Sequence, residues 1–478
     1  MTNPRARPDA ARADGGSYRD PDSFVFYHGG RVCRAVSPEL WPALEAAWQG
    51  GVIETLIRDG VLIGSELVPE GSEDHEAFSR HFPGMARFVL HQRVPSVSYP
   101  YEWSFSMLAD AALLHLTIQE ALLKADLSLK DATAFNVQFV RGRPVLIDLG
   151  SIEKPGRRDV WVAYSQFCRM FLYPLALQLF RGMNFRQIFL ADVQGISAEE
   201  TYKLLGFWRS FSPAFFMDVF LQRQFNRADQ ARVRRLKPQL TKGSGDPAVQ
   251  VFNLRRLARK VKKLRARYTC AGPWSEYEQT HSYAGSARGE KEEYVGRFLK
   301  TYKPATVLDL GCNTGVFSLM AAREGAQVVA MDGDHDCVEM LYRKVREEQL
   351  PILPLVINLT NPSPAIGFDN RERLRFADRI RGETVLALAL VHHLLVSGNL
   401  SLAAIRDLMA GLTTKYLVIE FVEREDEMFQ TLLALRKDTC GTLSLQTFVN
   451  VFQERFDLLD SRPLAGTRRH LLTMQRRA

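Results

Sequence analysis

The sequence predicts an α/β protein in two parts, with a parallel sheet in the C-terminal half and a mixed α+β domain before it. From Lys303 onward, apolar strands alternate with helices, which is typical of a parallel α/β sheet. Before that point, short strands come first and a long helical pattern over 104–125 follows them, without regular alternation. At about 150 residues per domain, a chain of 478 residues has room for two or three domains.

The composition narrows the class of protein. With 46% hydrophobic and 24% charged residues, the chain is neither disordered nor fibrous. Its six cysteines form no C-x-x-C pair, so we expect buried thiols rather than a zinc knuckle or a disulfide framework. The longest apolar run, Val385 to Val391, is far shorter than the roughly 20 residues of a membrane-spanning helix, and the N-terminus has no apolar signal-peptide core. We therefore expect a cytoplasmic protein with no membrane partner.

The formal net charge of +8 is concentrated in one segment. Between Ala231 and Tyr268, 13 Lys or Arg residues stand against a single acid, Asp246, so the rest of the chain is slightly acidic. Composition, charge and the change of pattern along the chain together divide it into four parts. We expect a disordered tail over 1–22, an α+β domain over 23–230, a basic helical linker over 231–270 and an α/β domain over 271–478.

The N-terminal domain begins with a predicted hairpin, because Gly29 and Gly30 supply the positive φ that a tight turn needs. A helix should begin near Pro38, with Ser37 as its N-cap. The elements expected after it are a strand over 87–97, the helix over 104–125, and two short strands over 136–140 and 145–149.

A glycine-rich turn follows the first strand of the C-terminal half. The run Thr306-Val-Leu-Asp-Leu-Gly-Cys-Asn-Thr-Gly315 leads directly into a helical pattern, so its glycines let the backbone approach a ligand at a helix N-terminus. A second strand ends at Asp332, whose carboxylate can accept hydrogen bonds from both hydroxyls of a ribose. Together these features predict a cofactor site. Later strands are expected over 352–359, 384–391 and 415–422, with a closing antiparallel pair over 456–461 and 469–475.

The D-x-G-x-N-x-G turn resembles that of class I S-adenosylmethionine-dependent methyltransferases, which implies a Rossmann-like sheet and S-adenosylmethionine as cofactor. By this resemblance, Asp309 orients the methionine amino group through the loop, Gly311 and Gly315 line the cofactor, and Asp332 binds the ribose. Asn313 replaces the central glycine of the motif, and Asn tolerates a left-handed backbone. The alternative is a Rossmann-like domain that has lost its cofactor.

The resemblance implies further cofactor contacts. Asn358 is the nearest candidate for the residue that contacts adenine. Trp274 and Tyr283 precede the first strand, where many methyltransferases of this class place an aromatic face near the sulfonium; ordinary packing is the alternative. The whole constellation resembles a bacterial group of nodulation-related methyltransferases.

Two histidines mark the expected catalytic position. The predicted fourth strand ends in Val391-His392-His393-Leu394, at the edge of the sheet where open α/β folds bind substrate. Either histidine can be a general base that deprotonates an oxygen or nitrogen nucleophile, or a residue that only shapes the pocket. No metal is expected in this half.

A second constellation lies in the N-terminal half. Asp131, Asn136 and Asp148 have the spacing of the catalytic loop and the metal-binding D-x-G of protein kinases and small-molecule phosphotransferases, which they resemble. The resemblance implies a kinase-like fold in which Asp131 accepts a hydroxyl proton while Asn136 and Asp148 hold Mg²⁺ with ATP. Arg34 is the basic candidate on the early hairpin. Alternatively, these residues are an N-cap and turn residues.

The basic segment contains a predicted helix over 253–267, whose leucines and valine recur at three- and four-residue steps beside a cationic face. That face suits RNA phosphates or an acidic neighbouring domain.

The main hypothesis is methyl transfer from S-adenosylmethionine to an oxygen or nitrogen of a small molecule. The alternatives are a bifunctional enzyme that also phosphorylates a substrate, and an RNA-modifying methyltransferase.

Overall fold

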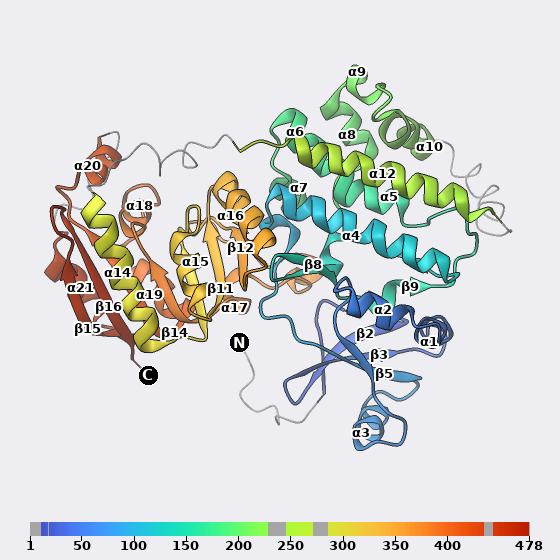
Figure 1. Ribbon diagram of the computed structural model, residues 1–478, viewed down its shortest axis with the longest axis horizontal. Coiled ribbons are helices and arrows are strands. Elements are labelled where there is room, and N and C mark those ends of the chain that lie inside the picture. Colours follow the sequence, from blue (N-terminus) through green and yellow to red (C-terminus); the bar gives the residue numbers. More distant parts are fainter. Residues whose placement is uncertain (1–10, 18, 228–244, 271–284, 435–442, 478) are drawn as a thin grey trace.

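The computed structural model describes residues 11–17, 19–227, 245–270, 285–434 and 443–477, which form two units side by side (Figure 1). The N-terminal unit extends from the first strand, through the helix ending at Arg267, to Tyr268, whose ring stacks on Phe105; the C-terminal unit begins at Gly285. Among the described residues, no helix has the length and apolarity needed to cross a bilayer.

The N-terminal unit opens with a five-stranded antiparallel sheet of order β1-β2-β3-β5-β4. The predicted hairpin is confirmed, with Gly29 and Gly30 at φ of 55° and 76° between its strands. The strands are β1 (Arg12–Ala13), β2 (Ser23–His28), β3 (Arg31–Val36), β4 (Ser65–Leu67) and β5 (Arg87–His91), with helices α1 (Trp41–Gln49), α2 (Val52–Arg58) and α3 (Glu73–His81).

The predicted long helix is α4 (Phe105–Lys124). It runs through the middle of this unit and is buried over most of its circumference. Two short antiparallel pairs follow it, and the predicted strands over 136–140 and 145–149 are thereby confirmed to within three residues. These strands are β6 (Ser128–Leu129), β7 (Val137–Val140), β8 (Arg143–Leu146) and β9 (Ile152–Glu153). The remaining helices are α5 (Tyr164–Phe167), α6 (Tyr173–Arg181), α7 (Phe185–Ala191), α8 (Ala198–Leu205), α9 (Phe207–Ser210) and α10 (Gln222–Arg227).

The prediction of a disordered tail over 1–22 is wrong for its described part. Strand β1 pairs with β2, and the Asp14 carboxylate accepts hydrogen bonds from the Gly16 amide at 2.7 Å and the Tyr27 hydroxyl at 2.8 Å. Arg19 forms an ion pair with Glu372 of the C-terminal unit. Polar side chains, rather than an apolar pattern, fix this segment.

The basic segment also needs correction. Its helix, α12 (Pro247–Arg267), has the predicted buried stripe, but it packs along α4 as part of the N-terminal unit and is not a separate linker there. Arg256 and Lys260 both pair with the fully buried Asp218. Much of its charge is therefore neutralised inside the N-terminal unit. The ionic partners of this helix are Asp110, Glu120 and Asp218.

The C-terminal unit is the predicted α/β sheet, with seven strands in the order β12-β11-β10-β13-β14-β16-β15. The first five are parallel, and the expected closing antiparallel pair is confirmed. They are β10 (Thr306–Leu310), β11 (Gln327–Asp332), β12 (Ile352–Val356), β13 (Gly382–Ala387), β14 (Thr413–Val422), β15 (Phe456–Pro463) and β16 (Arg469–Arg476).

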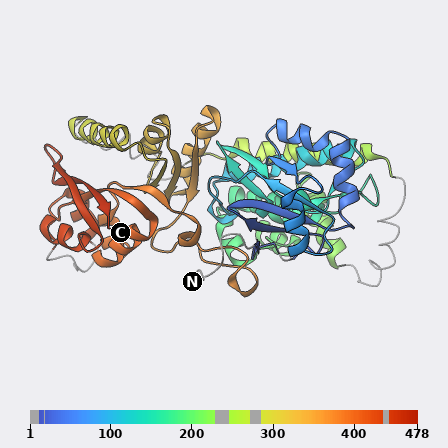
Figure 2. The ribbon, with the colours of Figure 1, turned by 90° about the horizontal axis from the view of Figure 1, so that it is seen from below.

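Helices cover both faces of this sheet (Figure 2). One apolar cluster joins α14, α15 and α16 to the sheet, and the other, which contains α19 and α21, continues into the core of the N-terminal unit. The helices are α14 (Gly285–Tyr302), α15 (Val316–Arg323), α16 (His335–Glu348), α17 (Phe376–Arg379), α18 (Val391–Val396), α19 (Leu402–Leu412), α20 (Glu427–Leu433) and α21 (Leu445–Phe452).

Candidate active site

A cavity of about 920 Å³ opens at the carboxyl edge of the parallel strands. Its lining brings together residues that are far apart in the sequence, from the glycine-rich turn to the histidine pair. Of the predicted site residues, those that line it are Asp309, Gly311, Asn313, Asp332, Asn358, His392 and His393. Trp274 and Tyr283 lie outside the described residues.

The glycine-rich turn has the left-handed backbone that the sequence predicts. Gly311, Asn313 and Gly315 have φ of 72°, 49° and 86°, so Asn313 does adopt the conformation expected of it. A Cβ on Gly315 would lie 2.4 Å from Leu341 Cδ1 of α16. Gly315 is thus required for helix packing, and it is Gly311 that lines the cavity.

Asp309 is buried at the end of β10, where its carboxylate accepts a 2.5 Å hydrogen bond from Ser318 Oγ of α15. Burial raises the pKa of Asp309 to about 6 despite this bond, because a dry environment penalises the charged form. The side chain joins the first strand to the following helix and so supports the turn between them.

Asp332 ends β11, as predicted, and its two carboxylate oxygens accept backbone N–H groups from opposite sides. The Asn313 amide donates to Oδ2 and the Asp334 amide donates to Oδ1, both at 2.8 Å. Burial raises the pKa of Asp332. Each carboxylate oxygen keeps capacity for a further hydrogen bond, so two hydroxyl donors can still be accepted.

Asn358 follows β12 and is exposed at the cavity wall. Its Oδ1 accepts hydrogen bonds from the Thr360 amide at 3.0 Å and from Thr360 Oγ1 at 2.7 Å. Because a carbonyl oxygen has two lone pairs, the group that remains for a ligand is the Nδ2 amide, which is a donor.

The histidine pair does not lie at the end of the fourth strand, which stops at Ala387; it lies on α18. Burial lowers the pKa of His392 to about 3, and its buried Nδ1 has no hydrogen-bond partner among the described residues. Burial also lowers the pKa of His393, which is less enclosed. The two rings lie 4.3 Å apart between centroids. Because burial lowers the pKa of each histidine, both imidazoles are neutral near pH 7.

A buried ionic cluster beside the histidines was not anticipated. Glu420 of β14 accepts hydrogen bonds from Lys291 Nζ at 2.6 Å, Arg469 Nη1 at 3.2 Å and the Ala389 amide at 2.9 Å. Burial opposes its charge, but Lys291 and Arg469 hold the pKa of Glu420 below its usual value. Arg469 also binds Asp426. This cluster anchors the turn before α18, and Lys291 and Arg469 line the cavity.

Comparison with known proteins identifies the family. The chain is 32% identical over 465 residues to nodulation protein NoeA of Rhizobium meliloti (strain 1021), a match that covers 96% of this chain and 95% of that protein. The chain belongs to the NoeA family.

Three further matches each cover less than half of the chain. A family model described as tellurite resistance protein TehB matches residues 287–368. The L11 ribosomal protein methyltransferase of Thermotoga petrophila (strain ATCC BAA-488 / DSM 13995 / JCM 10881 / RKU-1) is 44% identical over 59 residues, covering 12% of this chain and 22% of that one. The N-methyltransferase NodS from Bradyrhizobium japonicum WM9, solved with S-adenosyl-L-homocysteine, is 12% identical, with 43% of this chain and 97% of that chain covered at a TM-score of 0.32.

The C-terminal unit has the parallel sheet and the left-handed glycine-rich turn that the sequence predicts for it. In the described part of the chain, no group of three or more His, Cys, Asp or Glu side chains is arranged to hold a metal ion.

The second predicted constellation lies between the sheet and α4 of the N-terminal unit. Asn136 Nδ2 donates to Asp148 Oδ2 at 2.8 Å, so these two residues do meet. Arg34 Nη1 of β3 lies 2.9 Å from Asp148 Oδ1. Burial and the charge of Asp148 raise the pKa of Asp131. The kinase-like fold of this NoeA-family unit stays a prediction.

Proposed function

We propose that this enzyme transfers the methyl group of S-adenosylmethionine to an oxygen or nitrogen of a small molecule. The observation that carries the proposal is one continuous cavity that joins the glycine-rich turn to the histidine pair. Its volume of about 920 Å³ suits a cofactor together with a small acceptor, since small-molecule sites span roughly 300–1,000 Å³.

The residues present fit the cofactor, which supplies an electrophilic methyl group on a sulfonium when bound. Gly311 offers a wall without a side chain, and Asp332 offers two oxygens to the ribose hydroxyls. Asn358 donates through Nδ2 to an acceptor nitrogen of the adenine ring, because its Oδ1 is already occupied by Thr360. Asp309 supports the turn that faces the methionine part.

His393 is the better candidate for the general base. A base must be neutral before it accepts a proton, and both histidines meet this condition. However, a pKa of about 3 makes His392 too weak a base for an alcohol or amine near pH 7. We assign proton removal to His393, and we assign to His392 the positioning of α18 against Phe429, on which its ring stacks.

Calorimetric binding of S-adenosylmethionine tests the cofactor site. The wild type should bind, and Asp332→Ala should bind at least tenfold more weakly, because two hydroxyl partners are lost. Asp378→Ala is the matched control, since Asp378 is exposed, pairs with Arg375 and does not line the cavity. Absence of heat with the wild type, or equal affinity in the Asp332 variant, would overturn the proposal.

Incubation with labelled methyl donor and cell extract tests the acceptor class. Label should enter the small-molecule fraction and depend on His393. Label that enters only RNA would instead support the RNA-modifying alternative. In that case the affinity of the protein for RNA must weaken as the salt concentration rises. In that alternative, RNA phosphates would contact the cations of α12 that are outside the ion pairs given above, which are Arg259, Lys262, Lys263 and Arg267.

A phosphotransferase activity remains the second hypothesis for the N-terminal unit, but its residues do not fit Mg²⁺ as arranged. Arg34 takes the cationic position beside Asp148, and Asn136 presents its amide nitrogen rather than an oxygen ligand to that carboxylate. We therefore derive no phosphoryl transfer. Magnesium-dependent ATP consumption that disappears in Asp148→Ala would revive the hypothesis.

A further inference from the structure

The first turn of α16 is built into the candidate ribose site. Asp332 ends β11, the Asp334 amide donates to Asp332 Oδ1, and the Asp334 side chain caps the helix by accepting from the amides of Asp336 and Cys337. The helix starts at His335, immediately after this cap. A movement of His335 therefore moves the backbone group that holds the Asp332 carboxylate.

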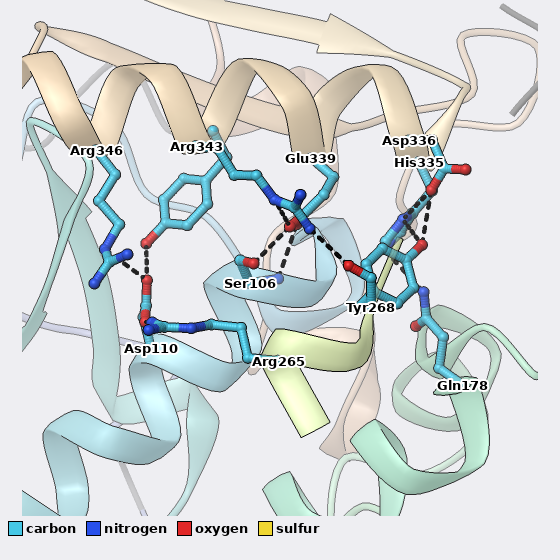
Figure 3. A network of polar contacts seen from close by, with 11 residues as sticks. Ser106, Asp110, Gln178, Arg265, Tyr268, His335, Asp336, Glu339, Arg343 and Arg346 are labelled. Carbon is cyan, nitrogen blue, oxygen red and sulfur yellow. Dashed lines mark hydrogen bonds and ion pairs between the residues drawn. The ribbon is translucent and has the colours of Figure 1, made fainter. Parts of the chain in front are cut away.

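Two side chains of the N-terminal unit hold His335 at both ring nitrogens (Figure 3). Gln178 Nε2 of α6 lies 3.1 Å from His335 Nε2, and the Tyr268 hydroxyl lies 3.0 Å from His335 Nδ1. Tyr268 also donates to Asp336 Oδ1 at 2.7 Å, and its ring stacks on Phe105 of α4 at 4.2 Å between centroids.

The directions of these hydrogen bonds form one consistent chain. The Gln178 amide can only donate through Nε2, so His335 Nε2 accepts. His335 Nδ1 then carries the proton and donates to the Tyr268 oxygen, whose own proton goes to Asp336. His335 and Tyr268 each donate one hydrogen bond and accept another, so the imidazole ring cannot turn without breaking contacts.

The rest of α16 is fixed to α4 by a second set of buried polar contacts (Figure 3). The fully buried Glu339 accepts hydrogen bonds from the Ser106 amide at 2.8 Å and from Ser106 Oγ at 2.5 Å. Further along, Tyr342 donates to Asp110 Oδ2 at 2.9 Å. The helix is therefore held at its start and about two turns later.

We propose that Tyr268 and Gln178 are positioning residues for cofactor binding, through which the N-terminal unit sets the place of the Asp332–Asp334 turn. This inference rests on the proposed cofactor site. It gives the N-terminal unit a role in methyl transfer that needs no catalysis of its own. The effect must be reciprocal: if the contact between the units strengthens cofactor binding by a given factor, cofactor binding strengthens that contact by the same factor.

The test compares two tyrosines at the same interface: Tyr268→Phe removes the hydroxyl that contacts His335 and Asp336, and Tyr342→Phe removes the hydroxyl that donates to Asp110. Tyr268→Phe should weaken S-adenosylmethionine binding about tenfold by calorimetry, and Gln178→Ala should weaken it in the same direction. Tyr342→Phe, on the same helix but far from the turn, should keep affinity within about twofold. Unchanged affinity in both Tyr268→Phe and Gln178→Ala, or equal weakening in Tyr342→Phe, would overturn the inference.

Hydrogen exchange of the full chain without ligand gives an independent readout. Amides 332–337 should exchange faster in Tyr268→Phe than in the wild type, while Tyr342→Phe leaves them unchanged. Equal exchange in all three proteins would contradict the inference. If the wild type binds no S-adenosylmethionine, the proposed cofactor site fails, and the exchange data still decide whether Tyr268 positions the turn.

Discussion

Asp309→Asn should change how stability depends on pH, because the native carboxyl is buried and hard to ionise. The side chain is almost inaccessible, and burial raises its pKa to about 6 from an ordinary value of 3.8. Asparagine has nearly the same shape and can still accept the 2.5 Å hydrogen bond from Ser318 Oγ. The substitution thus removes the titration with little change in packing.

The direction of the change in stability with pH depends on whether the folded or the unfolded state binds the Asp309 proton more tightly. The folded pKa is above the unfolded pKa, so the folded protein is favoured below about pH 4, and this advantage is lost as the pH rises through 6. A shift of about two units corresponds to about 3 kcal/mol. The free energy of unfolding of Asp309→Asn, minus that of the wild type, should therefore rise by about 3 kcal/mol between pH 4 and pH 8.

Urea unfolding at a series of pH values measures this difference. Most of the rise should fall between pH 4 and 6.5, with a plateau above. Ser318→Ala provides the companion variant: it removes a hydrogen bond that lowers the pKa of Asp309, so the titration should move to higher pH. Parallel wild-type and Asp309→Asn curves over the whole range would refute the reasoning.

Three further predictions, made with four substitutions, test the packing and chemistry of the site. Gly315→Ala should lower the free energy of unfolding by about 2 to 5 kcal/mol in thermal or urea unfolding, because its φ is 86° and its Cβ would collide with Leu341. Glu420→Gln should cost about 3 to 5 kcal/mol in urea unfolding, since it removes the buried charge that pairs with Lys291 and Arg469, and Arg469 keeps only Asp426; a loss below 1 kcal/mol would contradict the assigned ion pairs. His393→Ala should reduce labelled methyl transfer at least a hundredfold with cofactor affinity unchanged, whereas His392→Ala should chiefly lower the melting temperature; the reverse pattern would exchange their roles.

Local patterns in the sequence predicted the C-terminal sheet well, because each strand, turn and helix there is marked by nearby residues. The left-handed Asn313 and the carboxylate at the end of β11 depend on interactions within about 20 residues. The end of the fourth strand was misplaced because the residues from Val385 to Val391 form an unbroken apolar run. Ala389, at φ of 50°, turns the chain inside that run without any glycine to mark the turn.

The contacts that escaped prediction join residues far apart in the chain. Lys291 and Glu420 are separated by 129 positions, and Arg256 and Asp218 by 38. The leucine stripe of α12 indicated that one face is buried, but it carried no information about the partner helix. A charge run alone could not separate a nucleic-acid surface from a helix neutralised by its own domain.

The two units share buried contacts of both polar and apolar kinds. The buried Arg379 of the C-terminal unit pairs with the fully buried Glu102 of the N-terminal unit, and one apolar cluster contains side chains of both. Separating them would expose apolar surface and leave buried charges without partners. Yet, within the described part of the chain, every residue that lines the cavity belongs to the C-terminal unit. In the described residues, the N-terminal unit therefore reaches the cavity indirectly, through the contacts that Gln178, Tyr268 and Ser106 make with α16.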